Sequence, residues 1–370
     1  MTDWRESKVK NSFGNSITVT LFGESHGPQI GAVLDGIAPG IDIDMEFILH
    51  QLELRKPQGL ISTTRVEADI PTIVSGVFEG KTTGTPICIL FENKNVNSKD
   101  YSEIKNVIRP GHADYTAMEK YHGFQDYRGG GHFSGRLTTP IVAAGAILIQ
   151  ALQKKGIYIG SHVRKCGPVE DRPFEDFGLD IEKVNGLTFP VLDEVAAEKI
   201  YTYMEEAAKE GDSVGGILET VVTGVPAGVG EPWFDTMEGM LAHGLFSIPA
   251  VKGVEFGEGF AFSDMKGSEA NDEFQIQDGK IITKTNHNGG INGGITNGMP
   301  IRFQTVIKPT PSIYKVQNTV NANTMAEQSL QIEGRHDPAI IHRARVVVDS
   351  ITAIVLADML ALRYGTDWLS

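Results

Sequence analysis

The sequence predicts an α/β (α+β) fold, a β-α-β sandwich of two pseudo-symmetric halves with helices and antiparallel sheets. Three observations lead to this prediction. Strand-like runs alternate with apolar helical runs, glycine-rich blocks recur in both halves, and 42 glycines supply many tight turns. We treat residues 1–370 as one domain that contains a candidate internal duplication, over about 11–190 and 205–364.

The first half opens with strand signals and then a helix. Residues 17–22 (ITVTLF) and 30–35 have strand character on either side of a glycine turn. Residues 44–54 (DMEFILHQLEL) predict a helix that uses Asp44 as its N-cap.

Apolar helices are expected near the middle and the end of the chain, at residues 139–154 and 349–363. Residues 195–210 (VAAEKIYTYMEEAAKE) are amphipathic and predict a surface helix. Further strands are expected at residues 216–224, 301–307 and 345–348.

Two glycine-rich blocks recur in the same order. Residues 23–40 align without a gap with residues 211–228, and residues 76–94 align with residues 290–308. The second half therefore carries an insertion between its blocks. The alternative is convergent turn chemistry, because both halves need glycine at positive φ. Identical pairs in the first block are Gly23/Gly211, Ser25/Ser213, Gly27/Gly215, Val33/Val221, Gly36/Gly224 and Gly40/Gly228.

The charge and the cysteine content of the chain limit the kinds of binding partner and the compartment that we expect. A net charge of −14 argues against nucleic acid and anionic membranes, which require stripes of Lys and Arg. The two cysteines, Cys88 and Cys166, have no metal-ligand spacing, which fits a reducing cytoplasm without disulfides. Residues 1–11 are polar, so we expect no signal peptide. The apolar runs at 141–152 and 351–362 are shorter than the roughly 20 residues of a membrane span.

Histidine and arginine gather in glycine-rich loops. A histidine in such a loop can approach a ligand, whereas one on an apolar helix is usually a core residue. Arginine there can bind phosphate and carboxylate groups bidentately. The loops therefore predict a site for a small polyanion. They contain His26 (GESHG), Arg109 and His112 (RPGHAD), Arg128, His132 and Arg136 around a triple glycine, His287 (NHNGG), and Arg335, His336 and Asp337 (GRHD).

Each of these residues also has a structural interpretation. His26 and His112 could cap turns, and Asp337 could cap the helix that follows it. Residues 129–131 could form a plain turn, or their backbone N–H groups could hold an anion or a flat ring. We interpret five other histidines as structural: His50, His122, His162, His243 and His342.

Two short motifs of other enzyme classes are incomplete or misplaced. Residues 76–82 (GVFEGKT) resemble a phosphate-binding loop, but Ser75 stands where the first glycine is required. GESHG satisfies the G-x-S-x-G pattern of serine hydrolases, yet it precedes the sheet that this motif normally follows. GDSVG at residues 211–215 satisfies the same pattern. We expect no catalytic metal, because no HExxH, CxxC or carboxylate cluster is present.

Together, the loops resemble the chorismate synthase family. GESHGPQIGAVLDGIAP, GHFSGRLTTPIVAAGAI and GRHDPAIIHRARVVVDS are similar to three long signatures, in the family's order. The resemblance implies a carbon–oxygen lyase at the last common step of the shikimate pathway to aromatic amino acids. Such an enzyme would convert 5-enolpyruvylshikimate 3-phosphate to chorismate by a 1,4-anti elimination of phosphate. Reduced FMN would be required without net redox change.

The resemblance assigns roles to residues at matching motif positions. His26 would protonate the departing phosphate, His112 would manage the protonation of the reduced flavin, and Asp337 would assist the flavin N5. The substrate's anionic groups would be held by Ser25, Arg55, Arg109, Arg136 and Arg335. Flavin contacts would come from His132, Phe133, Ser134, Ala250, Gly293, Lys308, Pro309, Thr310, Pro311, Ser312 and Arg335.

The chain departs from the family pattern in two loops. Many members have an RRRP stretch followed closely by another arginine, but here Leu54 and Ile61 replace two of these arginines. Arg55 would remain for any contact with NADPH. Many members have Arg-Ser-Ser where this chain has residues 132–134 (HFS), so Phe133 is expected to pack rather than to hydrogen-bond.

The resemblance also implies a homotetramer. We expect an external flavin reductant, because neither a reductase domain nor a convincing G-x-G-x-x-G motif is present. NADPH would be a cofactor only if the chain reduces its own flavin. If the halves fold alike, one site would combine GESH and RPGH from the first half with GRHD from the second. The alternative to an enzyme is a flavin-binding carrier or sensor, which would tolerate replacement of His26.

Overall fold

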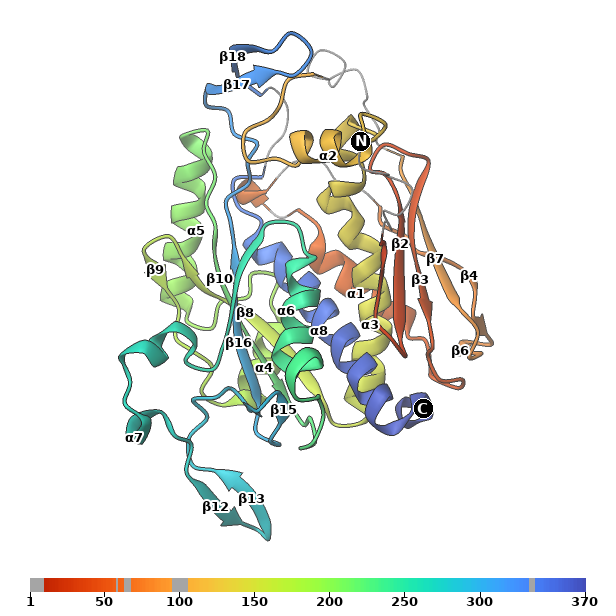
Figure 1. Ribbon diagram of the computed structural model, residues 1–370, viewed down its shortest axis with the longest axis vertical. Coiled ribbons are helices and arrows are strands. Elements are labelled where there is room, and N and C mark those ends of the chain that lie inside the picture. The colour runs from red at the N-terminus through yellow and green to blue at the C-terminus, as the bar shows by residue number, and fades with distance from the viewer. Residues whose placement is uncertain (1–9, 58, 63–67, 95–105, 333–336) are drawn as a thin grey trace.

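The computed structural model describes residues 10–57, 59–62, 68–94, 106–332 and 337–370. Two five-stranded antiparallel sheets enclose a layer of helices, as predicted (Figure 1). The first sheet has the order β1 (Ser12–Phe13), β2 (Thr18–Gly23), β3 (Gln29–Asp35), β7 (Ile87–Glu92) and β4 (Thr72–Ser75). The second has the order β9 (Val169–Glu170), β8 (Tyr158–Cys166), β10 (Gly216–Thr223), β16 (Ile301–Ile307) and β11 (Val251–Phe256).

Alternating side chains turn one face of each sheet towards the helices. In β7, Ile87, Ile89 and Phe91 are buried, while the residues between them are only partly covered. This period of two is expected for a strand with one face on the core. The core therefore lies between the sheets. Its helices are α1 (Met45–Arg55), α3 (Thr138–Lys154), α6 (Met237–Phe246) and α8 (Ile341–Tyr364).

The two halves use the same order of elements. The first half runs β2, β3, α1, β4, the hairpin β5 (Val77–Phe78) and β6 (Lys81–Thr82), β7 and α3. The second half runs β8, β10, α6, β11, the hairpin β14 (Ile291–Asn292) and β15 (Ile295–Thr296), β16 and α8. The strand orders β2-β3-β7-β4 and β8-β10-β16-β11 correspond, so the halves are pseudo-symmetric. The order of elements places the junction of the halves between α3 and β8, which differs from the predicted bounds of about 11–190 and 205–364. A common origin of the halves stays a prediction.

The second half carries two insertions that the first half lacks. One contains α4 (Phe177–Gly186) and α5 (Glu194–Lys209), and the other contains α7 (Gly267–Ala270) and the hairpin β12 (Phe274–Gln277) and β13 (Lys280–Thr283). The remaining elements are α2 (Asp114–Tyr121), β17 (Gln317–Asn321), β18 (Ala326–Leu330), η2 (Gly59–Ile61), η4 (Arg128–Phe133), η5 (Gly135–Leu137), η6 (Trp233–Asp235), η7 (Gly259–Asp264) and η8 (Thr366–Leu369).

Most predicted elements are confirmed. Asp44 caps α1, because its carboxylate accepts hydrogen bonds from the backbone N–H groups of Glu46 and Phe47. The strand predicted at 345–348 is wrong, since these residues belong to α8. Three consecutive valines favour a strand locally, but α8 is buried on nearly all sides, so tertiary burial overrides this preference.

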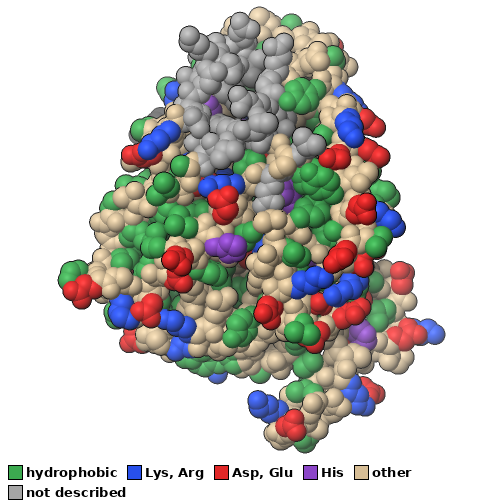
Figure 2. All heavy atoms as spheres, turned by 180° about the vertical axis from the view of Figure 1, so that it is seen from behind, with side chains coloured by type: hydrophobic (Ala, Val, Ile, Leu, Met, Phe, Trp, Pro, Cys, Tyr) green, Lys and Arg blue, Asp and Glu red, His purple; other side chains and the backbone are tan. Residues whose placement is uncertain are grey.

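One helix among the described residues, Gly135–Lys154, is long and apolar enough to cross a membrane by length and composition. In this structure 89% of its apolar window is buried, so the helix belongs to the core. The surface mixes charges, and on the face in Figure 2 many Lys and Arg side chains lie beside Asp or Glu. Lys165–Glu170 (2.7 Å) and Lys284–Glu273 (2.6 Å) are examples of such surface ion pairs.

Helices α3 and α8 approach each other closely at Gly145. A Cβ atom added there would lie 2.3 Å from Cβ and 2.6 Å from Cα of Ser350. Gly145→Ala should therefore lower the free energy of unfolding by about 1–3 kcal/mol, the usual cost of overpacking. Gly186→Ala in α4 is the matched control, because its Cβ meets nothing within 4 Å. Urea denaturation of both variants measures the effect, and a Gly145→Ala variant as stable as the control would contradict it.

His162 lies fully buried in β8 between two carboxylates. Its Nδ1 is 2.8 Å from Asp171 Oδ2, and its Nε2 is 2.9 Å from Glu219 Oε2. Both ring nitrogens donate only in the imidazolium form. Burial lowers the pKa of His162, but the hydrogen bonds to Asp171 and Glu219 outweigh burial and raise it. The histidine therefore ties the second sheet to the segment that leads into α4, which agrees with its predicted structural role.

This arrangement predicts a pH dependence of stability. Because the pKa of His162 is raised on folding, the stabilisation is complete below the unfolded pKa of about 6.5 and is lost as pH rises through the folded pKa. A tenfold difference in proton affinity between the folded and unfolded protein corresponds to about 1.4 kcal/mol. Unfolding free energies measured from pH 6 to pH 9 should fall more steeply for the natural protein than for His162→Gln. Equal slopes would show that His162 is neutral in the folded protein.

Candidate functional site

The predicted loops of both halves meet at the end of the sandwich where α2 lies (Figure 1). Lys308 of the second half donates from Nζ to the carbonyl oxygen of Gly111 at 2.6 Å. Thr310 Oγ1 donates to the carbonyl oxygen of Asp337 at 2.7 Å. The loop after β7, the loop after β16 and the segment before α8 therefore line one region.

His26 packs against the triple glycine. Ser25 Oγ lies 3.1 Å from the carbonyl oxygen of Gly129 and 3.2 Å from His26 Nδ1, and the imidazole is buried. A Cβ atom on Gly129 would lie 2.1 Å from His26 Cε1. Gly129, Gly130 and Gly131 have φ values of 59°, 85° and 54°, a conformation that favours glycine. The glycines thus allow this contact and are more than a connecting turn.

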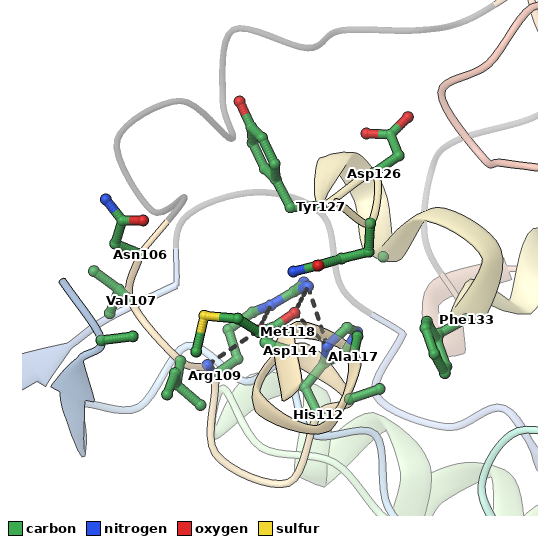
Figure 3. Close-up of a pocket in the computed structure, with 15 residues that line it drawn as sticks. Asn106, Val107, Arg109, His112, Asp114, Ala117, Met118, Asp126, Tyr127 and Phe133 are labelled. Carbon is green, nitrogen blue, oxygen red and sulfur yellow. Dashed lines mark hydrogen bonds and ion pairs between the residues drawn. The ribbon is translucent and has the colours of Figure 1, made fainter. Parts of the chain in front are cut away.

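His112 lies against the next glycine of the same loop, Gly130. Its Nδ1 is 2.7 Å from Asp114 Oδ1, and a Cβ atom on Gly130 would lie 3.4 Å from its Nε2. Arg109 donates two hydrogen bonds to the same carboxylate, from Nε to Oδ2 and from Nη2 to Oδ1, both at 2.7 Å (Figure 3). Burial raises the pKa of Asp114, but the hydrogen bonds from Arg109 and His112 outweigh burial and hold the pKa well below its usual range. Nδ1 of His112 also lies 3.1 Å from Nη2 of Arg109, so Arg109 and Asp114 together fix the orientation of the imidazole and leave Nε2 facing the glycine loop.

Two recesses flank Phe133. The smaller one, of about 40 Å³, is lined by Arg109, His112, Tyr127 and Phe133, among others (Figure 3). The larger one, of about 320 Å³, lies beside His132, whose Nδ1 is 2.8 Å from the carbonyl oxygen of Gly23. Phe133 packs edge-to-face on Tyr121, with ring centroids 6.1 Å apart.

Arg55 and Arg136 form a buried pair that shares the carboxylate of Asp69. Asn93 links this pair to the loop of His26, because its Nδ2 donates to the carbonyl oxygens of Glu24 at 3.1 Å and Gly27 at 2.9 Å. Arg55 also donates from Nε to Thr138 Oγ1 at 2.8 Å, and Arg136 donates from Nε to Asn93 Oδ1 at 3.2 Å. Burial lowers the pKa of Arg55 to about 9, although Asp69 opposes this shift. A bound anion would offset the energetic cost of burying these two guanidinium groups, so the pair suits a phosphate or a carboxylate.

Asp337 is held by the first turn of α8. Its Oδ1 lies 2.8 Å from Nη1 of Arg343. Arg55, Arg136 and Arg343 carry three positive charges against the two negative charges of Asp69 and Asp337, so this cluster has an excess of one positive charge. Arg335 and His336 lie outside the described residues.

The other residues predicted to contact flavin occupy different surroundings. The carbonyl oxygen of Ala250 accepts from the backbone N–H of Lys308 at 2.9 Å, and Pro311 faces Gly111. Ser134 Oγ caps η5 by accepting from the backbone N–H of Arg136, and Pro309 and Ser312 flank Thr310 and Pro311. Gly293 lies in the β14–β15 hairpin at the opposite end of the sandwich, so this chain does not bring it to the loops.

Sequence reasoning missed three residues of the site: Asp69, Asp114 and Arg343. Asp114 lies only two positions after His112 and could have been found as its carboxylate partner. Asp69 lies in no motif, so only the fold reveals its place between two arginines. Leu54 and Ile61, which replace expected arginines, are buried in the core.

The arrangement combines a proton donor, an anion site and a backbone cradle. His26 can hand a proton to an anion near the arginines, and the glycine loop leaves room for a flat group beside His112. Within the described ranges, no group of three or more His, Cys, Asp or Glu side chains could hold a metal ion. The histidines and arginines of these loops can transfer a proton to a bound polyanion.

Comparisons with known proteins converge on one family. The family model described as chorismate synthase matches residues 17–361. The chorismate synthase of Pyrococcus abyssi is 50% identical over 95% of this chain and 97% of its own length. That of Dehalococcoides mccartyi is 46% identical over 96% of this chain and 98% of its own length. A crystal structure of chorismate synthase superposes with a TM-score of 0.75 at 30% identity, covering 96% of this chain and 94% of that one.

Proposed function

This chain belongs to the chorismate synthase family, and from that premise we propose that it converts 5-enolpyruvylshikimate 3-phosphate to chorismate by a 1,4-anti elimination of phosphate. The family makes it an enzyme, and the proposed reaction makes it a carbon–oxygen lyase. One observation carries the proposal: His26 and His112 lie against neighbouring glycines of one loop, and Asn93 links the loop of His26 to a buried arginine pair. A phosphate leaving group and a proton to be managed require this combination.

The substrate's anionic groups are proposed to bind Arg55, Arg136, Arg109 and Arg335, with Ser25 beside them. His26 then donates its proton to the departing phosphate, because a protonated phosphate is the better leaving group. Ser25 positions this imidazole through its hydroxyl group, 3.2 Å from Nδ1. The burial of the histidine restricts access of water to the proton that it carries.

The residues present fit reduced FMN. The glycine loop is a cradle that a Cβ atom would fill, and Lys308 places a cation beside Gly111. When bound, reduced FMN supplies electron density for C–O cleavage and a basic N5 for the ring proton. His112, oriented by Asp114, and Asp337, held by Arg343, are proposed to manage protons on that side. His132, Phe133, Ser134, Ala250 and Lys308–Ser312 are proposed to hold the cofactor.

The deciding experiment measures anaerobic phosphate release from 5-enolpyruvylshikimate 3-phosphate. One arm supplies chemically reduced FMN, and the other supplies NADPH with oxidised FMN. Release in the first arm alone supports the lyase and an external flavin reductant, whereas release in both arms reveals an intrinsic reductase in which Arg55 is the candidate contact for NADPH. Folded protein that binds FMN but releases no phosphate in either arm would be a flavin-binding carrier.

We also propose a homotetramer that works in a reducing cytoplasm. Cys88 and Cys166 are free, and burial raises the pKa of the Cys166 thiol to about 12, so this thiol is inert. Gly293, which lies far from the loops of its own chain, could reach a flavin only if another subunit brings one to it. Light scattering coupled to size-exclusion chromatography tests the assembly.

A further inference from the structure

We propose that Arg343 is a positioning residue for the reaction: it holds Asp337 away from the anion-binding arginines and fixes that carboxylate to the end of α1. This inference rests on the proposed function, because it assigns a purpose to Asp337 within that site. Arg343 itself is not proposed to touch substrate or flavin.

The guanidinium group of Arg343 joins two elements from different halves. Nη1 lies 2.8 Å from Asp337 Oδ1, and Nε donates to the carbonyl oxygen of Arg55 at 2.8 Å. Arg343 lies in the first turn of α8, and most of that helix is buried between the sheets. The fork therefore extends from one of the most rigid elements of the fold, which makes it a suitable anchor for a carboxylate.

The second contact of Arg343 is made at the end of a helix. Arg55 is the last residue of α1, and the final carbonyl groups of a helix lack partners within that helix. They also carry the negative end of the helix dipole, which favours a cation. Arg343 satisfies this carbonyl group while the Arg55 side chain points to Asp69 and Thr138. One guanidinium group thus sets the positions of the backbone of Arg55 and the carboxylate of Asp337 together.

The neighbour of Arg343 on α8 supports the same segment from its other end. His342 Nε2 lies 3.0 Å from Ser62 Oγ, so α8 holds both ends of the segment 55–62. Burial lowers the pKa of His342 to about 3, and the nearby Arg343 contributes to this lowering. His342 is therefore neutral at physiological pH, and Arg343 is the cation of this turn that faces Asp337.

The need for this anchor follows from the charges nearby. Asp337 is close enough to Arg55 to stabilise its positive charge, although Arg55 is already paired with Asp69. A carboxylate released by Arg343 would be drawn to Arg55 and Arg136 and would compete with the anionic substrate. The same movement would take it away from the position where it serves the reaction. Arg343 therefore prevents Asp337 from forming an ion pair with the arginines that bind the anionic substrate.

The test combines Arg343→Met, Arg343→Lys, Asp337→Asn and the double variant Arg343→Met/Asp337→Asn. Arg343→Met should lower kcat about 10²-fold, the cost of a displacement of about 1 Å, with a smaller rise in KM. Arg343→Lys should recover part of kcat, because lysine keeps the charge but cannot satisfy both partners. The double variant should be no slower than Asp337→Asn, because Arg343 acts through that carboxylate. Arg363→Met, in the exposed last turn of α8, is the matched control and should match the natural enzyme.

A binding measurement without turnover separates the proposal from the proposed function. Titration with inorganic phosphate should show weaker binding to Arg343→Met, and affinity should return in the double variant, which lacks the competing carboxylate. If the natural protein releases no phosphate from the substrate, the proposed function fails, and this titration still decides the role of Arg343.

Three results would overturn the positioning role. A double variant slower than either single variant would mean that Arg343 acts independently of Asp337. A rise in KM with unchanged kcat would mean that Arg343 binds substrate directly. A fall in melting temperature alone, with normal kcat and normal phosphate affinity per folded molecule, would mean that it only stabilises the fold.

Discussion

Replacing His26 with alanine should lower kcat for phosphate release about 10²–10⁴-fold, the range expected for the loss of a general acid. The imidazole is buried against Gly129 and lies beside Ser25, so few other groups can deliver a proton to the same place. The fold should persist, because the substitution removes a side chain from a loop and not from the core between the sheets. Stopped-flow measurement of phosphate release with reduced FMN quantifies the effect.

Its matched control is His50→Ala, which removes an exposed histidine from α1 and should leave kcat unchanged. FMN binding should survive in both variants. A His26→Ala enzyme that keeps the natural kcat would show that His26 is not the proton donor of this reaction.

Gly129→Ala should reduce kcat about 10²-fold by displacing His26 rather than by removing it. The added Cβ would lie 2.1 Å from His26 Cε1 and 2.9 Å from Ser25 Oγ, so the imidazole and the hydroxyl group must both move. The backbone φ of 59° adds a cost of about 1–2 kcal/mol for a residue with a side chain. Activity and stability must therefore be measured separately, by turnover per folded molecule and by thermal unfolding.

Gly123→Ala separates the two effects. Gly123 also has positive φ, 79°, but a Cβ atom there meets nothing within 4 Å. Gly123→Ala should share the backbone cost of Gly129→Ala, without its clash, and keep full activity. If both variants lose the same fraction of kcat, backbone strain and not the contact with His26 is responsible.

The sequence alone predicted the layers of the fold better than the type and the ends of individual helices and strands. Period-two alternation and apolar helical runs identified strands and helices on both sides of the core, and the glycine repeats indicated two related halves. The error at 345–348 arose because three consecutive valines look alike in a buried helix and in a buried strand. The insertion with α4 and α5 carried weaker signals, since only its amphipathic second helix had a clear period.

For the site, motif residues could be predicted and their partners could not. His26, His112 and Asp337 lie in glycine-rich loops that a reader of the sequence can find. The carboxylate that joins Arg55 to Arg136 is contributed by Asp69, which belongs to neither motif. Such charge compensation depends on which loops the topology brings together, and no local pattern encodes it.

The turn that joins the halves, where Gly156 follows α3 with φ of 76°, has a practical consequence. A break there would leave two polypeptides, each with one sheet and one long core helix, and neither with the complete set of site residues. Fragment complementation would regenerate the site only when α3 and α8 pack against each other again. The recovered activity would then be proportional to the concentration of correctly associated fragments. Turnover would therefore measure how many fragments have assembled.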